Sequence, residues 1–158
     1  MNIEICKWYN NVDSPVMFMV DDLANVWVDT NENGQIDLGE DWGYAKNTNN
    51  SSFRYLNEVV LKDFPQVKTT FFTPVGVRVG IIEKPKIKSI SKRINCDEET
   101  KKFFREIHEN PKYEIAYHGT THGKVGKESQ DFVQEWQTYS SIDEAIEKIN
   151  DGKEIYKE

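Results

Sequence analysis

The sequence has little of what secreted and membrane proteins rely on. Its 158 residues include only 2 cysteines, Cys6 and Cys96, which stand far apart and form no metal-type pair. We expect both thiols to be reduced. No apolar run approaches the roughly 20 residues that cross a bilayer, so we expect no membrane partner. Residues 1–8 lack the apolar core of a signal peptide. We therefore expect a cytoplasmic protein, or an extracytoplasmic one if a leader has been removed.

Basic residues are fewer than acidic ones. The 20 lysines and arginines are outnumbered by 27 acids, which gives a net charge of -7. This balance argues against a nucleic-acid partner. A hydrophobic content of 37% and an aromatic content of 12% exclude a disordered chain. The length predicts one domain, spanning residues 1–158, with a core of its own.

Apolar runs and one-sided helical patterns alternate along the chain. They predict strands at 15–20, 67–73 and 113–117 and helices at 51–64, 97–107 and 142–156. Residues 29–50 and 75–94 are expected to be loops, the second with extended pieces. This alternation predicts an α/β fold whose parallel strands are joined by helical crossovers. In such folds the functional side chains lie at the carboxyl ends of the strands.

Metal-ligand side chains follow two of the predicted strands. Asp21 and Asp22 come directly after the first apolar run, and His118 and His122 follow the third. The His-Gly-Thr-Thr-His spacing puts two imidazoles on one side of a tight turn. Imidazole and carboxylate together suit zinc or a similar divalent ion. Two alternatives stay open: the histidines could be unrelated surface residues, and paired acids can cap a following turn.

These motifs resemble those of the polysaccharide deacetylase family, the NodB-homology domain. Val-Met-Phe-Met-Val-Asp-Asp at 16–22 resembles its first motif, and Tyr-Glu-Ile-Ala-Tyr-His-Gly-Thr-Thr-His at 113–122 resembles its second. The resemblance implies that Asp21 is the general base. It also implies that Asp22, His118 and His122 are the metal ligands. The family fold is a distorted (β/α) barrel, so we expect a partial barrel, truncated after the first strand–helix units.

The later motifs of that family have no match in this chain. They supply an arginine that orients the base, an aspartate partner and a late histidine that acts as general acid. His108, the remaining histidine, is expected to be a surface residue of the helix before the third strand. We therefore expect either a fragment or a chain that a second copy completes, hence a homo-oligomer. Without its acid half, the isolated chain is expected to be a poor catalyst.

Residues 29–40 fit the twelve-residue EF-hand calcium loop. Oxygen ligands stand at the expected positions, a glycine stands at position 6, and the backbone carbonyl of position 7 completes the set. The predicted ligands are Asp29, Asn31, Asn33, Gln35, Asp37 and Glu40. The flanks are atypical, since residues 25–28 make only a weak entering helix and 41–50 do not look like an exiting one. A polar loop that binds no metal therefore stays an alternative.

The leading functional hypothesis is a metal-dependent hydrolase that removes N-acetyl or O-acetyl groups from a carbohydrate with a metal-activated water. The saccharide substrate is implied by the family resemblance. Trp42 and Tyr44, in the loop after the first strand, could stack on a sugar ring, although ordinary loop packing explains them as well. Two other hypotheses remain: a non-catalytic metal- or carbohydrate-binding module, and a calcium-binding interaction domain.

Overall fold

A computed structural model describes residues 6–12, 14, 16–23 and 25–157. Its central element is a parallel sheet in the order β1-β4-β6. The strands are β1 (Phe18–Asp21), β4 (Thr69–Thr73) and β6 (Tyr113–Tyr117). All three predicted strands are thereby confirmed, although the first begins at Phe18 and the predicted start at Pro15 lies outside the described residues. Their β-branched and aromatic residues suit a pleated, half-buried surface, and helical crossovers make the pairing parallel.

Three α-helices follow the strands, as predicted. They are α1 (Ser52–Tyr55), α2 (Glu98–Glu109) and α3 (Ile142–Lys157). The side chain of Ser51 caps α1 by accepting from the amide of Arg54, and Asp97 caps α2 by accepting from the amide of Thr100. The first helix ends earlier than expected. A π-helical turn, η2 (Leu56–Val60), continues α1, and turns then lead to β4. Pro65 disfavours a helical conformation at Phe64, so the helix does not resume there.

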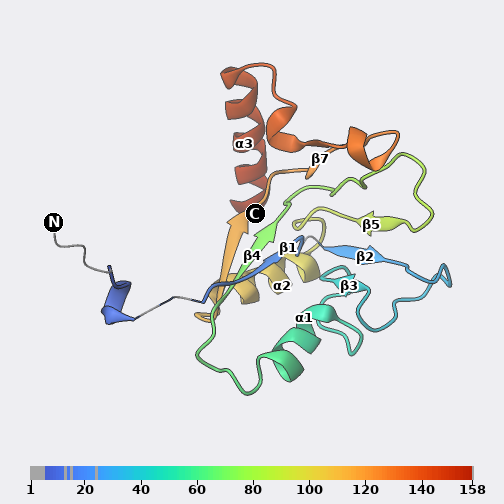
Figure 1. Cartoon of the computed structure of the whole chain (residues 1–158). Coiled ribbons are helices and arrows are strands. Elements are labelled where there is room, and N and C mark those ends of the chain that lie inside the picture. Colours follow the sequence, from blue (N-terminus) through green and yellow to red (C-terminus); the bar gives the residue numbers. More distant parts are fainter. Residues whose placement is uncertain (1–5, 13, 15, 24, 158) are drawn as a thin grey trace.

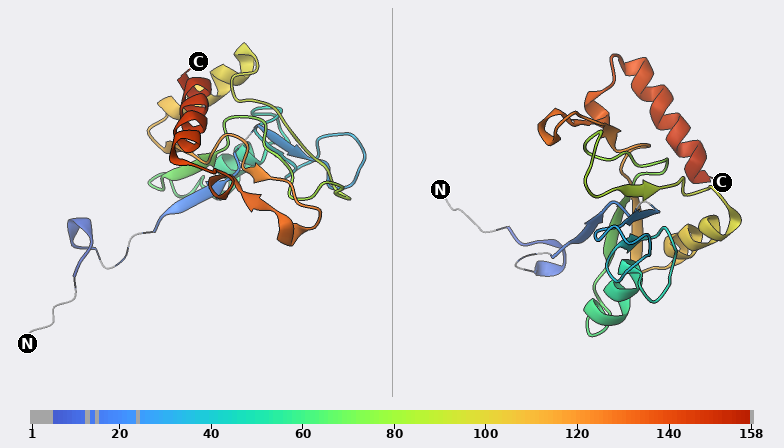
Figure 2. Two further views of the ribbon diagram at one scale, coloured as in Figure 1. Left: turned by 90° about the horizontal axis from the view of Figure 1, so that it is seen from above. Right: turned by 90° about the vertical axis from the view of Figure 1, so that its right-hand side faces the viewer.

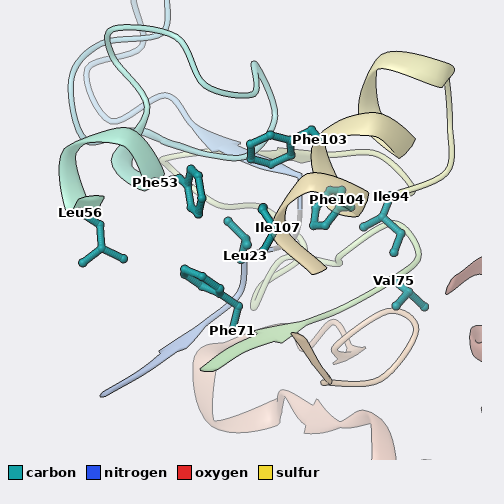
Figure 3. Packing of buried hydrophobic residues seen from close by; sticks show 9 residues of the cluster. All are labelled: Leu23, Phe53, Leu56, Phe71, Val75, Ile94, Phe103, Phe104 and Ile107. Carbon is teal, nitrogen blue, oxygen red and sulfur yellow. The ribbon is translucent and has the colours of Figure 1, made fainter. Parts of the chain in front are cut away.

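The hydrophobic core lies between one face of the parallel sheet and the helices α1 and α2. Phe71 of β4 is fully buried, with its ring centroid 5.7 Å from that of Phe53 and 5.6 Å from that of Tyr113. Figure 3 shows how the buried side chains meet from these elements. The core residues are Leu23, Phe53, Leu56, Phe71, Val75, Ile94, Phe103, Phe104 and Ile107. Packing of this cluster holds the carboxyl ends of β1 and β6 in place, and Asp22 and His118 directly follow these ends.

Five further strands are short, and only β5 lies in a segment, 75–94, where extended pieces were expected. β2 (Val26–Val28) pairs antiparallel with β3 (Asp41–Trp42) and with β5 (Ser89–Ser91), and β7 (Gly123–Lys124) pairs with β8 (Val133–Gln134). Residues 25–28, which we judged to be only a weak entering helix for the EF-hand pattern, thus contribute a strand and no helix. Val-Trp-Val favours a strand, and pairing on both sides with Val26 buried stabilises it. Short 3₁₀ turns complete the fold at Tyr9–Asn11, Ser129–Asp131 and Glu135–Gln137.

The chain is a mixed α/β fold built on a small parallel sheet (Figure 1). In the part that the structure describes, the sheet does not close into a barrel, because β1 and β6 each have one paired neighbour in it. The expected partial barrel is thus not confirmed beyond its α/β character. Residues 6–12 lie apart from the rest of the fold, as Figure 1 and the left view of Figure 2 show. None of the described helices combines the length and apolar content that a membrane crossing requires.

Candidate metal centre

Three ligand-type side chains meet at the carboxyl edge of the parallel sheet. Asp22 directly follows β1, His118 directly follows β6, and His122 lies one turn further on. One ligand atom from each of the three lies within 4.8 Å of the others. Parallel strands present their carboxyl ends at a common edge, so residues nearly 100 positions apart become neighbours. The structure thus brings together the three residues that the sequence singled out as ligands.

The carboxylate of Asp22 is turned toward the histidines by its backbone. The amide of Asp22 continues the ladder by donating to the carbonyl of Phe72 at 2.9 Å, and its φ of 62° then turns the chain out of the strand. Its Oδ1 lies 3.7 Å from Nε2 of His122. This oxygen is buried and accepts no hydrogen bond from the described residues. A buried, unpartnered carboxylate oxygen is costly and suits a cation.

The two imidazoles stand in a partly apolar setting. Their ring centroids lie 5.4 Å apart, and the ring of His122 packs 5.4 Å from that of Phe132. Burial, the largest cause, lowers the pKa of His122 below its ordinary 6.5, and the nearby Asp22 carboxylate raises it in return. Nδ1 of His122 is buried and has no hydrogen-bond partner among the described residues. Burial therefore favours the neutral imidazole, which is the form that binds metals.

Arg78 adds a positive charge that the sequence did not single out. Its Nη2 lies 2.8 Å from Oδ2 of Asp22, and the Arg78 side chain is only 13% exposed. The segment that carries it is joined to the histidine loop by three backbone bonds: Val75 to Gly119, Gly76 to Thr120 and Val79 to Thr121. Gly76 allows this close approach, since a Cβ there would lie 2.6 Å from the Thr120 carbonyl oxygen. Arg78 thus neutralises one oxygen of the carboxylate.

Glu135 is the other residue that the sequence did not single out. It is 5% exposed and lies behind the loop that connects His118 to His122. Its carboxylate accepts hydrogen bonds from the backbone of that loop and from the hydroxyl of Tyr139. An isolated glutamate between short, irregular elements has no local sequence pattern that reveals such a contact.

Asp21 lies on the other side of the strand end from the core. In the register, Asp21 pairs with Phe72, and Phe72 pairs with Ala116, so the three side chains share the sheet face opposite the core. The ring of His118 stands 6.0 Å from that of Phe72 on the same side. Asp21 itself is exposed. Its carboxylate is therefore open to solvent beside the cluster.

The predicted calcium loop is closed by its own hydrogen bonds. Asp29 accepts from the amides of Asn33 and Gly34, and Asp37 accepts from the side-chain amides of Asn31 and Asn33. Asn33 also accepts from the amide of Gln35 at 2.7 Å.

Glu40 closes the same loop from its far end. Its carboxylate is 4% exposed and accepts from the amides of Thr30 and Asp37 and from the Thr30 hydroxyl. Among the described residues, Asp22, His118 and His122 form the one group of His, Cys, Asp or Glu ligands that converges within 4.8 Å. The loop carboxylates do not converge to that degree, and calcium binding stays a prediction.

The two predicted sugar-stacking rings lie elsewhere. Trp42 packs against the core and lines a hollow of about 420 Å³ together with Leu38, Tyr55 and Val60. The ring of Tyr44 lies 6.2 Å from that of Trp27, and the ammonium group of Lys92 lies 4.7 Å from its centroid. No described contact joins either ring to the Asp22, His118 and His122 cluster, so their binding of sugar remains a prediction.

Comparison of the chain with protein-family models, with curated proteins and with solved structures found no match.

Proposed function

We propose that the chain is a metal-dependent hydrolase that resembles polysaccharide deacetylases and removes N-acetyl or O-acetyl groups from a carbohydrate. The observation that carries this proposal is the convergence of Asp22, His118 and His122 within 4.8 Å. Two of their polar atoms, Asp22 Oδ1 and His122 Nδ1, are buried and have no partner among the described residues. Such atoms cost free energy unless a ligand meets them.

The donor set fits a zinc-like ion. Two imidazole nitrogens and one carboxylate oxygen leave coordination positions open, as in catalytic rather than structural zinc sites. A divalent ion bound there would supply Lewis-acid chemistry, which activates a water molecule and polarises an acyl carbonyl. Because burial lowers the pKa of His122, its imidazole is favoured in the neutral form, whose ring nitrogen can bind a metal ion.

Asp21 is the proposed general base. Its exposed carboxylate stands at the same strand end as Asp22 but on the opposite side of the backbone, so the two acids have separate roles. Asp22 forms an ion pair with Arg78 and faces His122. Asp21 is free to accept the proton of a water molecule that attacks the acetyl carbonyl.

The described residues place no general acid for the leaving group beside the Asp22, His118 and His122 cluster. The sequence has three histidines, and His108 lies exposed on α2, where its Nδ1 meets the hydroxyl of Tyr156 on α3. It is therefore a surface residue, as predicted. Because a general acid typically contributes about 10²- to 10⁴-fold, we expect slow turnover by this chain alone.

Metal content and activity test the proposal together. After incubation with zinc and gel filtration, elemental analysis should find about one ion per chain in wild type and in His108→Ala, but little in His118→Ala. Equal content in the two variants would overturn the metal site. Release of acetate from acetylated chitooligosaccharides should be slow and should disappear in Asp21→Asn. A zinc-loaded protein without acetate release would favour the non-catalytic binding module instead.

We also infer that the loop at residues 29–40 binds calcium with a structural role. The support is that side chains at the predicted ligand positions already bond to the amides of the loop and to one another. Calcium would replace these internal donors with one cation.

A further inference from the structure

We infer that Glu135 is a positioning residue that holds the loop from His118 to His122 in the shape that presents both imidazoles to Asp22. This inference rests on the proposed metal site. Glu135 binds no metal in this assignment. It acts through the backbone of the ligand loop, in the way that groups behind a metal site orient the ligands themselves.

The carboxylate of Glu135 accepts from three consecutive backbone amides. Oε1 accepts from Thr120 at 2.9 Å, and Oε2 accepts from Thr121 at 2.7 Å and from His122 at 2.8 Å. Hydrogen bonds from backbone amides to an ionised carboxylate are short and strong. Successive amides that point at one anion form a concave nest, and here the anion is built into the chain.

This nest matches an unusual backbone. Gly119 has a φ of 92° and His122 has a φ of 79°, a left-handed value that is uncommon for residues other than glycine. Such conformations persist when surrounding contacts over-determine them. A Cβ at Gly119 would lie 2.5 Å from Oε2 of Glu135, so glycine is what lets the carboxylate come close enough to reach the following amides.

Glu135 is itself held in place from both sides. Its own amide donates to the carbonyl of His122 at 3.2 Å, so the two residues are bonded reciprocally. The pairing of β7 with β8 places Gly123 opposite Gln134 and so brings Glu135 under the loop. The hydroxyl of Tyr139 donates to Oε1 at 3.0 Å.

These contacts also limit what Glu135 does. Both of its oxygens are occupied by donors, and the residue is almost fully buried. It therefore has no free oxygen with which to bind a metal or to hand a proton to a leaving group. Its contribution is the position of His122, whose Nε2 faces Asp22.

The test compares Glu135→Gln with Asp41→Asn in the full chain. Both changes replace one carboxylate oxygen of a buried acid by an NH2 group. Asp41 is a matched control, because it also accepts a hydrogen bond from a loop amide, that of Ala45 at 3.2 Å. Cobalt(II) alone is the probe, titrated by its visible absorption spectrum. Removal of a group behind a metal site typically costs about 10- to 100-fold in affinity. We expect such a loss and an altered cobalt spectrum in Glu135→Gln, and wild-type behaviour in Asp41→Asn.

Hydrogen exchange of the amides of residues 120–122 in the metal-free protein separates this inference from the proposed function. If wild type binds no cobalt, the proposed metal site fails, yet faster exchange in Glu135→Gln would still support the positioning role. Unchanged exchange and unchanged cobalt affinity in that variant would overturn it. If Glu135→Gln does not fold, Tyr139→Phe removes one donor from Oε1. It should weaken cobalt binding severalfold and speed exchange at Thr120, and no change in either would overturn the inference.

Discussion

The guanidinium Nη2 of Arg78 lies 2.8 Å from Oδ2 of Asp22, so the proposed metal ligand already has a positive partner. The other oxygen of that carboxylate, Oδ1, is left buried and faces Nε2 of His122 at 3.7 Å. Arg78 therefore stabilises the carboxylate without occupying the oxygen that points into the cluster. A dication bound there would sit close to the guanidinium, and the two positive charges would repel each other.

Arg78→Gln should lower the stability of the metal-free protein and increase its response to zinc. Loss of a hydrogen bond to a charged, partly buried group typically costs about 1–3 kcal/mol. In this variant no guanidinium competes with zinc for the Asp22 carboxylate. Zinc should therefore stabilise Arg78→Gln more than it stabilises wild type. Melting temperatures with and without zinc measure both effects. Arg54→Gln is the control, because it breaks an exposed ion pair between Arg54 on α1 and Glu58 on η2. An equal zinc-induced rise in wild type and Arg78→Gln would mean that the guanidinium does not influence the ion.

Calcium should raise the melting temperature through the loop at residues 29–40. A ligand that binds only the native state adds about 2.7 kcal/mol at a hundred times its dissociation constant. For a chain of this size, that corresponds to a rise of roughly 5–10 °C. The rise should vanish in Glu40→Ala and persist in Glu32→Ala, which removes an acid of the same loop outside the ligand pattern. A wild-type protein that does not respond to calcium would leave only the polar-loop alternative.

The same glutamate should make the calcium-free fold sensitive to acid. Hydrogen bonds lower the pKa of Glu40 from 4.5 to about 2. The bond from the Thr30 hydroxyl has the largest effect, followed by those from the amides of Asp37 and Thr30. A lowered folded-state pKa stabilises the fold above the unfolded value, and this stabilisation is lost as the pH falls from about 4.5 toward 2. Urea unfolding in a chelator should therefore show a steeper loss of stability between pH 5 and pH 2 in wild type than in Glu40→Gln. Identical slopes would show that these hydrogen bonds do not hold the carboxylate ionised.

Local patterns in the sequence were sufficient for the frame of the fold. The strand at Thr69–Thr73 is a β-branched and aromatic run, and the helix at Glu98–Glu109 has an aspartate cap and ends before a proline. The rule that parallel strands gather function at their carboxyl ends then related Asp22 to His118 across 96 positions. Each of these signals is contained in a few neighbouring residues or in the order of the elements.

The contacts that complete the site have no such signal. Arg78 meets Asp22 across 56 positions from a segment that reads only as loop, and Glu135 reaches back 13 to 15 positions to three backbone amides. A backbone amide is the same in every residue, so no side-chain pattern identifies it as a partner. The strands β2, β3 and β5 span two or three residues each, which is too short for a two-residue alternation to be recognised.

The final prediction is that the chain forms a homodimer through the open face of its parallel sheet, centred on Met19 and leaving Asp21 at the carboxyl edge in solvent. The face opposite the core carries Met19 of β1, Thr70 and Phe72 of β4, and Glu114 of β6, which are exposed or only half-buried. Parallel sheets are normally covered on both faces, because their strands are apolar on both sides. The ladder that ends at β1 also leaves backbone groups available for pairing.

Sedimentation at micromolar concentration should therefore give twice the mass of one 18.4 kDa chain. Met19→Glu should shift the protein toward monomer, because it would bury a charge against the second copy. Val59→Glu is the matched control, since Val59 is 54% exposed and Met19 is 50% exposed, but Val59 lies on η2 outside the sheet. A wild-type monomer would exclude the dimer. A dimer that survives Met19→Glu and is lost in Val59→Glu would place the interface on the helix instead, because a charge disrupts only the surface that association buries.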